Sequence, residues 1–162
     1  MNQPGDAALT LEQKAANFDL MRHKEEVTRL IYIIVNSLLQ RAYLHDQSKA
    51  RSPEVEKFAE VTPKLHGMTF GSPEYKESLE LLEDALAHHY AHNRHHPEHW
   101  ANGLDDMNLI DIIEMFCDWF AASKRHADGN MQTSIEKNAK RFDMSTQLRH
   151  IFENTLELFD GH

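Results

Sequence analysis

Apolar residues recur at spacings of three and four along most of this chain, and this periodicity restricts it to helices. The clearest stripe contains His23, Val27, Leu30, Ile31, Ile34 and Leu38. Such a stripe is typical of the buried face of an α-helix, whereas a half-buried strand requires strict alternation. The sequence shows no convincing run of such alternation. It therefore predicts an all-α fold, with His23 on the buried face of its helix.

Start and stop signals divide the chain into six or seven helices. Thr10 and Gln13 are predicted to form a capping box at the start of the first helix. The triplet Ser-Pro-Glu supplies a cap, a first-turn proline and a favourable acid at two later starts. The first predicted helix begins after Thr10, and the next two run from Ser52 to about Glu60 and from Ser72 to Pro97. A further helix is predicted over about 107–124, with Asp105 or Asp106 as its cap, and two more over 134–142 and 146–159. We expect a flexible stretch at 1–9 and one compact helical bundle over 10–162.

Composition narrows the class of protein. The 162 residues are enough for one domain with its own core, and the net charge of −9 argues against binding to a nucleic-acid duplex. A single cysteine, Cys117, fits a reducing compartment. The polar N-terminus has no signal-peptide pattern, and the longest apolar stretch, Leu30 to Leu39, falls far short of the ~20 residues that cross a bilayer. We expect a cytoplasmic protein without membrane contact, whose acidic C-terminal helices pack either within the chain or across a homodimer.

Histidine is the over-represented residue. The chain has twelve, and six of them lie between positions 88 and 99. Neutral imidazole is the commonest metal ligand in proteins. His89 continues an apolar stripe and is the strongest single candidate. If the helix continues to Pro97, the two competing faces are His89, His92 and His96 on one side and His88, His92 and His95 on the other. Periodicity leaves this choice open.

The segment His45-Asp46-Gln47-Ser48-Lys49 places an imidazole, a carboxylate and an ammonium group close together in sequence. His23 precedes His45 by 22 residues, about 33 Å along a straight helix at 1.5 Å per residue. The two histidines can therefore act at one site only if the helix bends between them, and Asn36-Ser37 and Gln40-Arg41 are the plausible places for that bend.

Asp118 lies in the middle of a predicted helix, on the border of its buried face. A bare carboxylate there is costly unless it is paired or bound to a metal. Asp111 and Glu114 precede it by seven and four residues, so all three carboxylates share one side of the helix.

The order His23, His45-Asp46, Asp118 resembles the H…HD…D signature of the HD-domain metal-dependent phosphohydrolases, an all-α superfamily. Residues 45–49 resemble the HDxGK element of its HD-GYP branch, and His95-His96 resembles a later HH pair of that branch. Residues 113–125 are similar to the helix that bears its last metal-binding aspartate. The strings HHPEHW and EMFCDW are also similar to those of a small, uncharacterised HD-like family of bacteria and phages. The resemblance covers roughly residues 17–125.

The chain also departs from that pattern at three points. Ser48 replaces the usual glycine, no GYP follows the HH pair, and Ala121 stands where relatives often carry a second aspartate. The resemblance therefore does not extend to cyclic-dinucleotide specificity, although it still implies a metal site.

The resemblance implies one or two divalent ions per chain. Its proposed ligands are His23, His45, Asp46 and Asp118, with His89, His95 and His96 as candidates from the histidine cluster. A mixed nitrogen and oxygen set suits Mn, Fe, Ni, Zn or Mg. Such an ion would polarise a phosphoryl oxygen and lower the pKa of a bound water.

Three residues are candidates for catalysis: Asp46, Lys49 and Glu114. By analogy with the family, Lys49 would meet the phosphate charge of the substrate. Three roles are open for Glu114: an acid on the helix surface, a hydrogen-bond partner of a ligand histidine, or a general base. The commonest of these three roles for such a glutamate is to hydrogen-bond a ligand histidine.

These residues favour a phosphohydrolase acting on a small phosphorylated compound, most simply a nucleotide. The alternative is a non-catalytic metal-binding or regulatory module on an HD-like scaffold. A plain helical interaction domain with incidental histidines, and a redox or oxygenase role at a histidine and carboxylate iron site, also stay open.

Overall fold

The computed structural model describes residues 9–65, 73, 81–124 and 129–159. These residues form six α-helices and four short 3-10 helices and contain no strand, so the all-α prediction is confirmed. None of these helices is both long enough and apolar enough to cross a membrane. The chain divides into two compact units, Met1–Gln40 and Arg41–His162.

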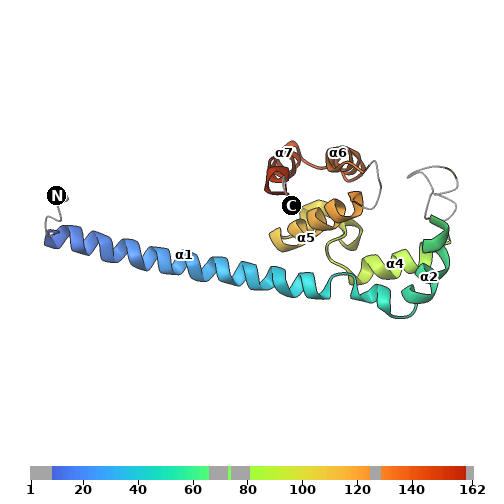
Figure 1. Ribbon diagram of the computed structural model, residues 1–162, viewed down its shortest axis with the longest axis horizontal. Helices are drawn as coiled ribbons and strands as arrows, with labels where there is room; N and C mark the ends of the chain where they lie inside the picture. Colours follow the sequence, from blue (N-terminus) through green and yellow to red (C-terminus); the bar gives the residue numbers. More distant parts are fainter. Residues whose placement is uncertain (1–8, 66–72, 74–80, 125–128, 160–162) are drawn as a thin grey trace, which may run out of the picture. The chain divides into compact units, whose positions relative to one another are not determined.

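Helix α1 (Leu11–Leu44) supplies the described structure of the first unit (Figure 1). The predicted capping box is confirmed: the Gln13 N–H donates to Thr10 Oγ1 at 3.2 Å, and the Thr10 N–H donates to Gln13 Oε1 at 2.9 Å. Within that unit most of the apolar stripe is exposed, His23 included, although a buried face was expected; Leu38 is half-buried. The physical reason is that the described residues of this unit contain no second element against which the helix can pack.

In the second unit, helices α2 (Glu54–Leu65) and α4 (Glu83–His92) pack against each other and against a short 3-10 helix, η1 (Gln47–Ala50). Helix α2 continues five residues beyond its predicted end at Glu60 and includes Pro63. The predicted start at Ser72-Pro73-Glu74 lies outside the described residues, except for Pro73.

Helix α4 ends at His92, five residues before the predicted stop at Pro97. Asn93 adopts an extended conformation, with φ of −121° and ψ of 101°, and its side-chain amide donates to the His89 carbonyl at 2.8 Å. This bond satisfies a carbonyl at the end of the helix. Residues 93–96 therefore leave the helix, and the later histidines follow loop geometry instead of helical periodicity.

The rest of the second unit contains α5 (Leu109–Ser123), α6 (Met131–Arg141) and α7 (Thr146–Thr155), followed by the 3-10 helix η4 (Leu156–Phe159). The cap of α5 is Asn108 and not Asp105 or Asp106 as predicted, because those two residues lie in a separate 3-10 turn. Asn108 Oδ1 accepts from the N–H of Ile110 at 2.9 Å and of Asp111 at 3.1 Å. The cap at Asn130 starts α6 three residues earlier than predicted, whereas α7 starts where predicted.

An apolar core lies between α5, α6 and α7. Its buried residues are Met115, Phe116, Trp119, Met131, Ile135, Met144 and Phe152. Among the apolar residues of α5, Phe116 and Trp119 are buried, whereas Leu109 is 59% exposed. This core fixes α5, the helix that carries Glu114 and Asp118.

The core predicts a contrast between two adjacent residues of α7. Phe152 is 3% exposed and contacts the rings of Phe116 and Trp119, whereas Ile151 is 51% exposed. We expect Phe152→Ala to lower the free energy of unfolding by about 3–5 kcal/mol and Ile151→Ala by no more than about 0.5 kcal/mol. Urea unfolding of both variants measures the difference, and equal losses would show that the core is wrongly placed.

Candidate metal centre

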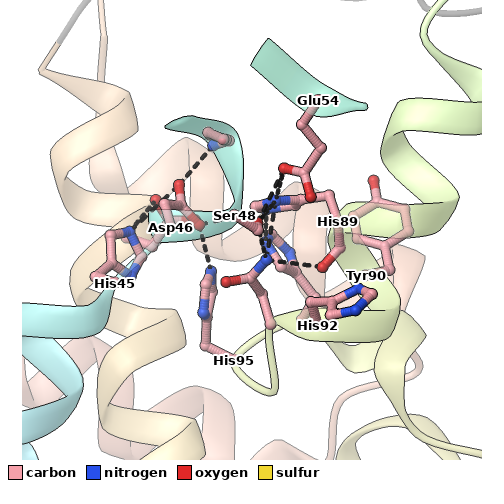
Figure 2. A network of polar contacts seen from close by, with 12 residues as sticks. His45, Asp46, Ser48, Glu54, His89, Tyr90, His92 and His95 are labelled. Atoms are coloured by element: carbon pink, nitrogen blue, oxygen red, sulfur yellow. Dashed lines mark hydrogen bonds and ion pairs between the residues drawn. The ribbon is translucent and has the colours of Figure 1, made fainter. Parts of the chain in front are cut away.

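Imidazoles and carboxylates from four segments of the second unit converge on one point (Figure 2). His45 and Asp46 follow the last turn of α1, His89 lies in α4, and Asp118 lies in α5, while His95 and His96 come from the loop after α4. One group contains Asp46, His89, His95 and His96, a second contains His45, Asp46 and Asp118, and a third contains His45, His95 and Glu114. Within each group, one ligand atom per residue lies within 4.8 Å of the others. The first two groups share Asp46, and the third has one histidine in common with each of them.

Asp46 is placed by a sharp change of direction between α1 and η1. Its φ of 55° and ψ of 18° are left-handed, a conformation that aspartate tolerates better than most residues. Asp46 Oδ1 lies 3.3 Å from His89 Nε2 and 3.5 Å from His95 Nε2. Asp46 Oδ2 lies 2.5 Å from Lys49 Nζ and 3.5 Å from His45 Nε2. The carboxylate therefore meets three imidazoles and one ammonium group.

Two buried glutamates contact the Nδ1 atoms of these imidazoles, on the side of each ring away from Asp46. Glu54 Oε2 lies 2.9 Å from His89 Nδ1 (Figure 2). Glu114 Oε1 lies 2.9 Å from His45 Nδ1 and 3.1 Å from His95 Nδ1. A nitrogen facing a carboxylate oxygen at this distance carries the proton and donates it. In His89 and His95 the opposite nitrogen, Nε2, faces Asp46 Oδ1.

Two atoms at the centre are buried without a hydrogen-bond partner among the described residues: Asp46 Oδ1 and His95 Nε2. A third, Glu114 Oε2, faces Arg41 Nη2 at 2.5 Å and is thereby paired. Orphaned polar atoms in a protein interior call for an unseen water or ion. An acceptor oxygen beside acceptor nitrogens is the arrangement expected for a cation site.

The distances between the proposed ligand atoms agree with the coordination of a small cation. His89 Nε2 and His96 Nε2 are 2.9 Å apart, and both imidazole contacts of Asp46 Oδ1 fall between 3.3 and 3.5 Å. Ligands at the usual ~2.05 Å from Zn²⁺ or a similar ion lie about 2.9 Å apart in an octahedron and about 3.4 Å apart in a tetrahedron. The residues present therefore fit a divalent ion.

The protonation states follow from these contacts. Hydrogen bonds with Asp118 and Glu114 raise the pKa of His45 to about 10. Burial and the neighbouring imidazoles lower the pKa of His96 to about 3. Burial raises the pKa of Asp46, but the neighbouring His89 and Lys49 outweigh it and lower the pKa well below the usual range. The centre thus combines ionised carboxylates with a neutral His96.

An ion-pair network of Asp111, Arg41 and Arg94 connects to the centre through Glu114. Asp111 is fully buried and lies 2.9 Å from Arg41 Nη1, while Arg94 approaches it through Nε at 3.2 Å and Nη2 at 3.1 Å. Arg41 also pairs with Glu114. Arg94 packs over the ring of Trp100, 4.4 Å from its centroid. This network connects α5 with the end of α1 and with the histidine loop.

The structure brings most of the predicted site residues together. His45, Asp46, His89, His95, His96 and Asp118 converge, Glu114 contacts two of them, and Lys49 pairs with Asp46. His23 is in none of the groups found among the described residues, and it lies in the first unit. Helix α1 runs without interruption through both positions where a bend was expected.

Neither face predicted for the histidine cluster is correct. His88 and His92 stack on each other, with ring centroids 4.0 Å apart, and lie outside the converging groups. His95 and His96 reach the centre because the chain leaves the helix after His92, an event that helical periodicity does not anticipate.

Sequence reasoning missed Glu54 and Arg41 as parts of this centre. Glu54 was interpreted only as a favourable acid in a first helical turn, yet it is fully buried and contacts His88, His89 and Ser48. Burial lowers the stability of its charge, and these hydrogen bonds more than offset that, so the pKa of Glu54 is lowered. No local pattern distinguishes it from an exposed first-turn acid.

The sequence matches DUF5662, a family of unknown function, over residues 12–158. The chain belongs to the DUF5662 family. The matched region includes every residue of the candidate centre. No curated protein and no solved structure matches the chain.

In this DUF5662 protein, the buried Asp111 predicts a large effect on stability. Asp111→Ala leaves two guanidinium groups without their shared carboxylate, and we expect the free energy of unfolding to fall by about 3 kcal/mol. Asp105→Ala, in an exposed 3-10 turn, is the matched control, with an expected change within about 0.5 kcal/mol. Thermal unfolding in the presence of a chelator makes the comparison independent of metal. A loss at Asp111 as small as the control's would contradict the network.

Proposed function

We propose that this protein is a metal-dependent phosphohydrolase acting on a small phosphorylated compound, most simply a nucleotide, in the cytoplasm. The proposed ligands of one or two divalent ions are Asp46, His89, His95 and His96, together with His45 and Asp118. One observation carries the proposal: the buried Asp46 Oδ1 has no hydrogen-bond partner in the described part of the chain and faces two imidazole nitrogens. The ordered resemblance to the HD signature supports the choice of reaction.

The charge balance of the centre supports a cation. Two cations, Arg41 and Lys49, face four carboxylates, which are Asp46, Glu54, Glu114 and Asp118. Because His45 is protonated at neutral pH, these groups together carry a formal charge of −1, which becomes −2 when His45 releases its proton to act as a ligand. One divalent ion neutralises the centre, and a second makes it attractive to a phosphate.

The donor set favours certain metals. Imidazole nitrogens with carboxylate oxygens suit Mn, Fe, Ni, Zn or Mg, and the single cysteine, Cys117, is exposed and not part of the groups. When bound, such an ion polarises a phosphoryl oxygen and lowers the pKa of a bound water.

The residues of the chain have separate roles in this proposal. Glu54 and Glu114 orient imidazoles, and Asp46 and Asp118 balance the charge of the ion. Lys49 lies at the edge of the centre, with its side chain 39% exposed. If Asp46 held a metal ion, the ammonium group of Lys49 would be available to contact a phosphate oxygen.

A second candidate is a non-catalytic metal-binding or regulatory module. The contact between Lys49 and Asp46 favours it, because a lysine engaged at 2.5 Å by a carboxylate offers less charge to a substrate. Ala121, which stands where HD relatives often carry a second aspartate, is consistent with the same interpretation.

Phosphate release separates the two candidates. With Mn²⁺ or Co²⁺, the wild-type protein is expected to hydrolyse nucleotides or simple phosphoesters. Asp46→Ala should lower the rate at least about 100-fold, because a metal contributes several kcal/mol to the stability of the transition state. His92→Ala, on the exposed end of α4, is the control and should keep full activity. A metal-loaded wild-type protein that is inert on both substrate classes would reject the hydrolase and leave the binding module.

Metal binding tests whether the second unit holds the ligands by itself. We expect His89→Ala to lose most of the bound Mn²⁺ or Co²⁺ in equilibrium dialysis and His23→Ala to retain it, because only His89 lies in a converging group. Equal losses in the two variants would mean that α1 contributes a ligand.

A further inference from the structure

Glu114 contacts one imidazole from each of the two groups that share Asp46, and it forms the third group with these same two imidazoles. Its Oε1 atom lies 2.9 Å from Nδ1 of His45 and 3.1 Å from Nδ1 of His95. His45 belongs to the group with Asp118, and His95 belongs to the group with His89. We propose that Glu114 is a positioning residue that couples the two groups, so that both imidazoles depend on one carboxylate oxygen. This inference rests on the proposed metal centre.

The contacts of Glu114 separate this role from that of a ligand. Its Oε1 atom is occupied by two imidazole N–H groups, and its Oε2 atom faces Arg41 Nη2 at 2.5 Å. The side chain is 8% exposed. Neither oxygen therefore faces an open coordination position, and the same occupation argues against the general-base reading.

The ring geometry explains what the contact achieves. The two nitrogens of an imidazole point in divergent directions, so a ring held at Nδ1 by Glu114 presents Nε2 on the opposite side. For His45 that atom lies 3.6 Å from Asp118 Oδ1, and for His95 it lies 3.5 Å from Asp46 Oδ1. The ring centroids are 4.5 Å apart. A single carboxylate thus aims two rings at adjacent positions of the centre.

The bonds are charge-assisted at Glu114. Burial raises the pKa of its carboxyl group, but hydrogen bonds with His45 and His95 outweigh burial and lower the pKa to about 2. A carboxylate behind an imidazole fixes its tautomer and increases its basicity as a ligand. Removing the charge should therefore weaken both rings together.

Glu54 supplies the matched control. It is also buried and also accepts from imidazole Nδ1 atoms, but those of His88 and His89. Two glutamates of similar burial therefore serve different histidines, and each variant has its own set of affected rings.

The test is ¹⁵N NMR of the histidine side chains in metal-free protein, with Glu114→Gln, Glu114→Ala and Glu54→Gln. In the wild type we expect protonated Nδ1 atoms in His45, His89 and His95. Both Glu114 variants should shift the Nδ1 resonances of His45 and His95 together and leave His89 in place. Glu54→Gln should shift His89 alone of these three. If Glu114→Ala does not fold, Glu114→Gln decides the comparison, because its neutral oxygen still accepts but more weakly.

A shift of only one of the two rings, or of neither, in a folded Glu114 variant would overturn the coupling. Zn²⁺ affinity, measured against a competing chelator, should fall about 10- to 100-fold in Glu114→Gln. If the wild-type protein binds no Zn²⁺, the proposed function fails, while the NMR comparison in metal-free protein still decides the positioning role. The two failures are therefore distinguishable.

Discussion

The described structure of the second unit depends on the cost of burying charge. The carboxylate of Asp46 has one oxygen that no described residue hydrogen-bonds, and two imidazoles face it. An unpaired buried charge costs several kcal/mol or more, so such an arrangement persists only when something compensates for it. Lys49 compensates on one oxygen. The other is the natural position for a cation, and the ends of α1 and α4 meet α5 there.

The surroundings of this carboxylate form a second layer of charge. Glu54 and Glu114 hold the outer nitrogens of three histidines, and Arg41 connects Glu114 to the buried Asp111. Fixed tautomers and fixed rings lower the cost of organising a site when a ligand arrives. A centre organised in this way is consistent with both the hydrolase and the binding module, since each requires a preformed ion site before any substrate or partner chemistry.

Local signals in the sequence predicted much of the fold. The capping box at Thr10 and the start of α7 are where they were expected, because caps and first-turn residues act over three or four positions. The true cap of α5 was missed since Asn108, Asp105 and Asp106 are all competent caps, and tertiary packing decides among them. The convergence of His95 and His96 could not be predicted either, because it depends on where Asn93 ends α4. Glu54 was missed for a related reason: its burial comes from contacts with residues far along the chain.

The central claim is that imidazoles and carboxylates of the second unit hold a divalent ion. X-ray absorption spectroscopy of untagged protein loaded with Zn²⁺ or Mn²⁺ tests it most directly. The account predicts nearest neighbours that are only nitrogen and oxygen, with the multiple-scattering signature of several imidazole rings, and its loss in Asp46→Ala. A metal without imidazole neighbours, or a wild-type protein that takes up no metal at all, would contradict the account.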